Sequence, residues 1–100
     1  MTAEKIEVRD NPEAGRLEVE IDGKVAFAQY RVTDEGIVFP HTLTPPELEG
    51  RGIGGALVKA GMHMAESRGL KVIPRCSFFA DYIARHPEYE GLVHPDYQKR

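Results

Sequence analysis

A cluster of glycines stands at the start of the longest helical pattern in the chain. The run reads Glu-Gly-Arg-Gly-Ile-Gly-Gly-Ala-Leu over residues 49–57, and it follows a proline-rich approach at residues 44–46. The first N–H groups of a helix lack acceptors inside the helix, and the helix dipole is positive at that end. Glycines let an anion approach the main chain closely. The pattern predicts a phosphate cradle, and a phosphate bound there suggests a cofactor.

One cysteine and four histidines are the other side chains that could do chemistry. The single cysteine, Cys76, excludes an internal disulfide and a thiolate zinc site, so any chemistry it does is that of a free thiol. A free cysteine also packs commonly as a small hydrophobe, and both roles stay open. His63, His86 and His94 show no ligand spacing, so we expect no metal site.

The first half of the chain predicts strands that lead toward the glycine cluster. Apolar residues alternate with polar ones over residues 6–9 and 17–21, and further strands are expected over 24–32 and 36–42. Asp22-Gly23 is a pair favoured in tight hairpin turns. Pro40 cannot donate to a ladder, which predicts an edge, a bulge or a bend, so the sheet should open near His41.

The second half changes to helical periodicity. Apolar residues recur at helical spacing within residues 52–68, at Ile53, Leu57, Ala60 and Met64. Gly69 is placed to end this helix. Residues 70–74 predict a short strand that returns parallel to the fourth strand in a right-handed crossover. A second helix is expected over 78–85, with Ser77 as its N-cap and His86-Pro87 as its end.

Composition limits the class of protein. A chain of 100 residues, 41% hydrophobic and 29% charged, suits one domain over residues 1–100. The net charge of −3 gives no general attraction for nucleic acid or an anionic membrane. No apolar run approaches the ~20 residues of a membrane span, and residues 1–5 lack the apolar core of a signal peptide, so we expect a cytoplasmic protein. A charged edge strand at residues 5–10 leaves a monomer or a weak homodimer open.

Four motifs, in this order, resemble the small stand-alone members of the GNAT acetyltransferase superfamily. They are His41-Thr42, Gly50-Arg51-Gly52-Ile53-Gly54, Pro74-Arg75-Cys76-Ser77 and Arg85-His86-Pro87-Glu88-Tyr89. The superfamily's phosphate motif, Q/R-x-x-G-x-G/A, falls on residues 49–54, with Glu49 where Gln or Arg is usual. The resemblance covers almost the whole chain. It implies a minimal GNAT fold of the α+β class, with a mixed, mostly antiparallel five-stranded sheet and two main helices.

The resemblance also implies acetyl-CoA as the cofactor and transfer of its acetyl group to an unidentified acceptor, expected to be an amine. In the superfamily the fourth and fifth strands splay apart, and the pantetheine arm inserts between them. Here the main chain of residues 42–44 would hold the pantetheine amides, and the N–H groups of residues 51–55 the pyrophosphate. The implied cofactor-binding residues are Thr42, Leu43, Thr44, Arg51, Gly52, Ile53, Gly54, Gly55 and Ser77.

For catalysis, the resemblance places the thioester between the strand ends, with His41 on one side and Cys76 on the other. A helix start and the neighbouring Arg75 would lower the pKa of the Cys76 thiol from its reference near ~8.5. His41 could deprotonate an amine that attacks directly, or Cys76 could accept the acetyl group first; we favour direct transfer. Tyr82 is the candidate for the tyrosine that protonates the departing CoA thiolate in larger relatives.

Other functions stay open at this stage. Larger GNAT enzymes carry elements that shape the acceptor site, and this short chain lacks them, which is compatible with a CoA-binding regulatory or interaction module of little activity. A structural interaction domain without a cofactor is a further alternative. Residues 50–55 also match the dinucleotide pattern G-x-G-x-x-G. No hydrophobic strand leads directly into Gly50 and no acidic ribose ligand follows the next strand, which disfavours NAD. The core is expected to include Phe27, Tyr30, Phe78 and Phe79.

Overall fold

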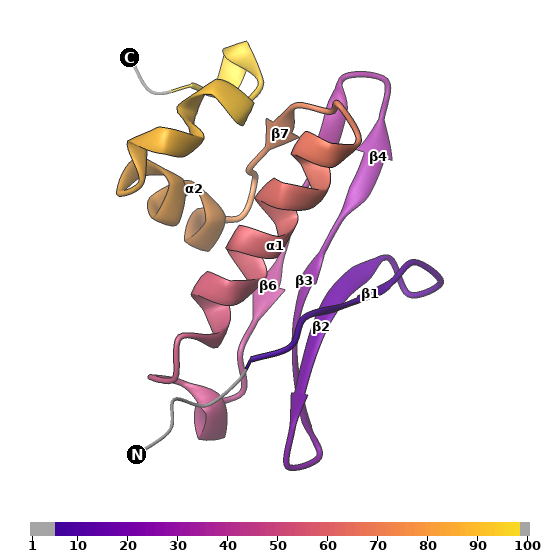
Figure 1. The fold of residues 1–100 in the computed structure, drawn as a ribbon, viewed down its shortest axis with the longest axis vertical. Coiled ribbons are helices and arrows are strands. Elements are labelled where there is room, and N and C mark those ends of the chain that lie inside the picture. The colour runs from indigo at the N-terminus through magenta and orange to yellow at the C-terminus, as the bar shows by residue number, and fades with distance from the viewer. Residues whose placement is uncertain (1–5, 99–100) are drawn as a thin grey trace.

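Two small sheets and two α-helices make up the fold (Figure 1). The computed structural model describes residues 6–98. The first sheet contains, in spatial order, β1 (Arg9–Asn11), β2 (Arg16–Ile21), β3 (Lys24–Gln29) and β6 (Thr42–Leu43). The second contains β4 (Arg31–Thr33), β5 (Gly36–Val38) and β7 (Val72–Ile73). The α+β class is confirmed, whereas the expected single five-stranded sheet is wrong.

The β2–β3 hairpin follows the predicted alternation. Asp22 and Gly23 both have positive φ, 53° and 77°, as a tight turn between right-twisted strands requires. Leu17 pairs with Ala28 on the buried face. The first strand begins later than predicted, because the ladder with β2 starts at Arg9 and lies beyond most of the expected segment 6–9.

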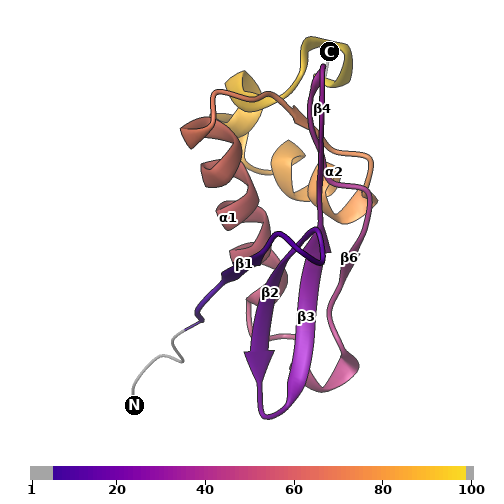
Figure 2. The same ribbon diagram turned by 90° about the vertical axis from the view of Figure 1, so that its right-hand side faces the viewer.

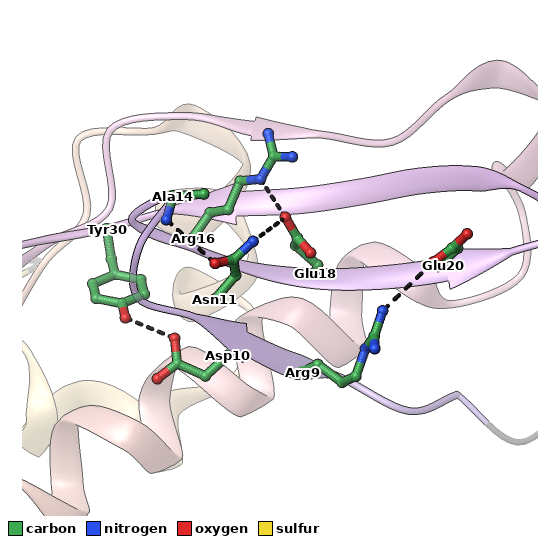
Figure 3. Close-up of polar contacts among 8 residues, drawn as sticks. All are labelled: Arg9, Asp10, Asn11, Ala14, Arg16, Glu18, Glu20 and Tyr30. Atoms are coloured by element: carbon green, nitrogen blue, oxygen red, sulfur yellow. Dashed lines mark hydrogen bonds and ion pairs between the residues drawn. The ribbon is translucent and has the colours of Figure 1, made fainter.

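Polar side chains tie β1 to its neighbours, as Figure 3 shows. Arg9 reaches Glu20 at 3.5 Å, and Tyr30 donates to a carboxylate oxygen of Asp10 at 2.6 Å. Arg16 and Asn11 donate to Glu18, and these bonds lower the pKa of that carboxyl group. The bond from Tyr30 therefore joins β1 to the point where β3 gives way to β4.

A β-bulge divides the sheet in two. β3 and β4 form one run interrupted at Tyr30, and β5 and β6 form the antiparallel run beside it. Arg31 faces Val38, whereas the Gln29 N–H donates to the His41 carbonyl at 2.8 Å. One residue of the first run, residue 30, therefore faces two residues of the second, 39 and 40. Such an extra residue bends a strand and disrupts its ladder, so the break predicted near Pro40 is confirmed.

The two helices lie close to their predicted positions. α1 (Ile53–Ser67) is flanked by Gly52 and Arg68, and β7 returns parallel to β5 as expected. α2 (Ser77–Ala84) has Cys76 rather than Ser77 as its N-cap. The predicted cap was therefore one residue late. Cys76 has extended φ and ψ of −78° and 130°, and its carbonyl accepts the first bond of the helix, from Ala80.

Short 3₁₀ segments complete the described chain: η1 (Pro46–Leu48), η2 (Pro87–Leu92) and η3 (Pro95–Tyr97). Beyond η2, Val93 forms a bridge with Val72, and the His94 N–H donates to the Val72 carbonyl at 2.9 Å. The C-terminal segment therefore lies along the edge of β7. Within residues 6–98, no helix combines the length and the apolar character that crossing a membrane requires.

The core lies between α1 and one face of the first sheet (Figure 2), and it continues toward α2. Phe39 and Phe79 stack in it with ring centroids 4.4 Å apart, and both are fully buried. Of the four aromatic residues expected in the core, only Phe79 is fully buried. Phe27 is half-buried on the opposite face of the sheet, under the guanidinium group of Arg16. Phe78 is 38% exposed, and Tyr30 is half-buried.

Candidate cofactor-binding groove and thiol

A groove of about 570 Å³ opens where the two sheets separate. The Cys76 N–H donates to the Phe39 carbonyl at 2.9 Å, extending the contact between the β5 and β7 segments. Beyond this bond β6 pairs with β3 and leaves its other side to the groove. The lining residues come from three segments: Thr42, Leu43 and Thr44; Leu48, Glu49, Gly50, Gly52, Ile53, Gly54 and Gly55; and Phe78.

The start of α1 places amides without helical acceptors at one end of this groove. The first bond of the helix runs from the Ala56 N–H to the Gly52 carbonyl, at 3.1 Å. The N–H groups of residues 53–55 precede it and have no helical acceptor. No side-chain cap from the described residues engages this helix start. Gly50 and Gly52 have φ of 82° and 79°, a left-handed conformation that glycine adopts at little cost. This geometry fits a diphosphate.

The next two glycines have a different structural reason. A Cβ at Gly54 would lie 2.6 Å from Cζ of Phe78, and one at Gly55 would lie 3.1 Å from Cε2 of Tyr82. Both contacts are closer than ordinary van der Waals distance. Gly54 and Gly55 therefore let α2 approach the start of α1, which brings the Phe78 ring into the groove.

The free side of β6 supplies further main-chain groups. In an antiparallel ladder, successive residues direct their N–H and C=O groups to opposite sides. Because the pair formed by Gln29 and His41 is hydrogen-bonded, the next bonded pair is Phe27 with Leu43. The main-chain groups of Thr42 therefore face away from β3, toward the groove. Those of Leu43 are directed to β3.

Cys76 is half-buried beside the lining residue Thr42 and does not itself line the groove. Its Sγ is 3.5 Å from the hydroxyl oxygen of Thr42. Burial by itself raises the pKa of the thiol, but hydrogen bonds from the Thr42 side chain and from the main-chain N–H groups of Phe79, Phe78 and Thr42 outweigh it. The pKa of Cys76 consequently lies below its ordinary value. Arg75, which we expected to contribute, instead donates to the Tyr97 hydroxyl at 3.0 Å.

His41 lies on the other side of β6. Its ring contacts Phe27, with centroids 5.9 Å apart, on the face of the sheet opposite α1. Thr42, the next residue, faces inward beside Ala28. Among residues 6–98, no hydrogen bond joins His41 to Cys76. The two candidate catalytic groups therefore stand on opposite sides of the strand, and the structure does not bring them into contact.

The remaining predicted site residues lie at the margins of the groove. The ring of Tyr82 packs over Gly55 and stacks on His86, with centroids 4.1 Å apart, outside the groove lining. Arg51 and Ser77 are exposed and do not line the groove either. Sequence reasoning missed Phe78 as a lining residue. The available signal was the pair of adjacent glycines in α1, which indicates close approach by another element. No metal-binding group of three acidic, His or Cys side chains occurs within the described part of the chain.

Comparison with known proteins identifies the family. No curated protein matches the chain significantly. Residues 16–92 of the 100 match the family described as GCN5-related N-acetyl-transferase. The matched segment includes the β2–β3 hairpin, the bulge, the glycine cluster and both α-helices. The chain therefore belongs to the GCN5-related N-acetyltransferase family, whose general activity is acetyl transfer.

Proposed function

We propose that this protein transfers an acetyl group from acetyl-CoA to an amine. The observation that carries the proposal is one groove that joins the amides without helical acceptors at the start of α1 to the free side of β6. Acetyl-CoA has a diphosphate at one end and amide groups along its arm. It therefore needs main-chain groups both at the helix start and along β6. When bound, it supplies an activated acyl group.

Each part of the groove has a distinct task in this proposal. The N–H groups of residues 53–55 bind the diphosphate. The main-chain carbonyl of Thr42, with the main chain of Thr44 beyond it, binds the amides of the arm. Leu48, Ile53 and Phe78 provide apolar walls that exclude water from the methylene segments.

His41 is the proposed general base. It is exposed on the outer face of the sheet, where an amine can approach from the side opposite to the groove. In direct transfer the amine nitrogen attacks the acyl carbon, the carbon–sulfur bond breaks, and His41 takes the proton that the nitrogen gives up. The departing thiolate takes a proton from water. We assign Tyr82 to the packing of α2 on α1 rather than to this proton, because its ring lies over Gly55 and on His86.

The test uses purified protein, acetyl-CoA and a panel of amines, with CoA release and acetylated product both measured. Direct transfer predicts that His41→Ala lowers kcat by about 10²-fold or more, whereas Cys76→Ala retains most of the activity. Loss of activity in Cys76→Ala, with acetyl found on Cys76 of the unsubstituted protein, would instead favour transfer through the thiol.

A CoA-binding module with little catalytic activity is the second candidate. The position of His41 favours it, because the ring lies against Phe27 on the face of the sheet opposite α1 and His41 does not line the groove. Tight binding of CoA without acetylated product across the amine panel would support this role and contradict the enzyme.

A further inference from the structure

The main chain of Cys76 is held on both sides. Its N–H donates to the carbonyl of Phe39, the residue that follows β5, and its own carbonyl accepts from the N–H of Ala80 in α2. The backbone of Cys76 therefore has a fixed place at the junction of strand and helix.

Thr42 reaches the sulfur from β6 because of the bulge. Without the extra residue, the pairing of Arg31 with Val38 would continue and place His41 beside Ala28, facing α1. With it, Thr42 takes that inward position and His41 turns outward. The Thr42 hydroxyl then lies 3.5 Å from Sγ of Cys76, and its main-chain groups face the same side.

We propose that Thr42 is a positioning residue for the Cys76 thiolate. Its hydroxyl and main-chain N–H act with the N–H groups of Phe78 and Phe79, so that donors from β6 and from α2 meet at one sulfur. In the thiol form the sulfur donates to the hydroxyl oxygen; after ionisation the hydroxyl rotates and donates to the sulfur. The inference goes beyond the proposed direct transfer, in which the thiol takes no part, because it assigns a side-chain role to a residue that lines the groove.

The donors around the sulfur are uncharged. Arg75, the adjacent cation, is engaged with Tyr97, and the imidazole of His41 lies against Phe27 on the other face. The lowered pKa of Cys76 is accordingly a matter of hydrogen bonds rather than of a neighbouring charge. A thiolate held in this way responds weakly to salt, because screening acts on interactions between charges.

The test is the pH dependence of alkylation of Cys76 by iodoacetamide, followed by mass spectrometry. Cys76 is the only cysteine, so the measured rate reports one thiol. Thr42→Val keeps the shape and the main-chain N–H but removes the hydroxyl. We expect it to raise the apparent pKa of the thiol by about one pH unit, the size of one hydrogen bond to a charged group. Thr42→Ser restores the hydroxyl and should return the pKa to the value of the unsubstituted protein.

Thr33→Val is the matched control, because the Thr33 hydroxyl bonds within the β4–β5 turn and its loss should leave the thiol unchanged. An unchanged pKa in Thr42→Val, or failure of Thr42→Ser to restore it, would overturn the proposal. The unsubstituted protein gives an independent check if Thr42→Val fails to fold. Its thiol pKa should stay nearly constant between about 0.05 and 0.5 M salt, whereas a marked rise toward the ordinary value would identify a cation as the cause.

These measurements need no CoA and no acceptor. If the protein transferred no acetyl group, the expected effect of Thr42→Val on the pKa of Cys76 would still hold. If Thr42→Val left that pKa unchanged, the proposed binding of CoA would be unaffected. The two outcomes are therefore distinguishable.

Discussion

Two pairs of glycines stand within six residues of each other and serve different needs. Gly50 and Gly52 have left-handed backbone conformations, and nothing lies within 4 Å of where their Cβ atoms would be. Gly54 and Gly55 lie in α1, and their missing side chains make room for aromatic rings of α2. The first pair orients the amides of the helix start, and the second shapes the wall beside them. Substitutions in the two pairs should therefore fail in different ways.

Gly61, like Gly54 and Gly55, makes room for aromatic rings, and its substitution should have the largest effect on stability. A Cβ there would lie 2.9 Å from Phe39 and 3.2 Å from Phe79, two buried rings that are stacked on each other. We expect Gly61→Val to lower the free energy of unfolding by about 3 kcal/mol, because neither ring has space to move. Urea unfolding measures this loss.

Gly91→Ala is the control for Gly61→Val, since its Cβ would meet nothing within 4 Å. It should change the free energy of unfolding by less than about 0.5 kcal/mol. Equal effects at the two positions would show that the aromatic contact is not what requires glycine at residue 61.

Gly52 tests the role of the left-handed backbone conformation in the binding of CoA. An alanine there relaxes from φ near 79° in the free protein and turns the amides of residues 53–55 away, so binding must restore that conformation at a cost of about 1–2 kcal/mol. We therefore expect the affinity for CoA to fall by about 5- to 30-fold. Calorimetry measures the affinity for CoA. If Gly52→Ala binds CoA like the unsubstituted protein, the left-handed conformation has no role in binding.

The smallest effect on stability should come from substituting Gly54, alone and together with Phe78. Gly54→Ala alone forces the partly exposed Phe78 ring to shift, which offsets the gain of alanine in a helix. In a Phe78→Ala background the same change should stabilise the protein by up to about 1 kcal/mol. Thermal unfolding of the four proteins gives the coupling. Simple additivity would contradict the packing role of Gly54.

Local patterns predicted the elements that depend on local order. The β2–β3 hairpin followed from its alternation and its Asp-Gly turn, and α1 and the parallel β7 followed from their periodicity. The glycine cluster was correctly placed at the start of α1, because the requirement for free amides there is local.

The features that the sequence did not predict depend on which residues of one strand or helix face those of its neighbour. Pro40 indicated a break, but only the partner strand shows that one residue faces two. That single extra residue splits the sheet and decides that His41 faces outward while Thr42 faces Cys76. The place of Phe78 likewise depends on how closely α2 approaches α1, a distance that periodicity within one helix does not contain.

The most direct test of the account follows backbone amides by NMR while CoA is added to ¹⁵N-labelled protein. We expect the resonances of Ile53, Gly54 and Gly55 to shift the most, because their N–H groups would bind the diphosphate. Saturation of CoA binding with these three resonances unmoved would contradict the assignment of the glycine-lined helix start as the phosphate cradle.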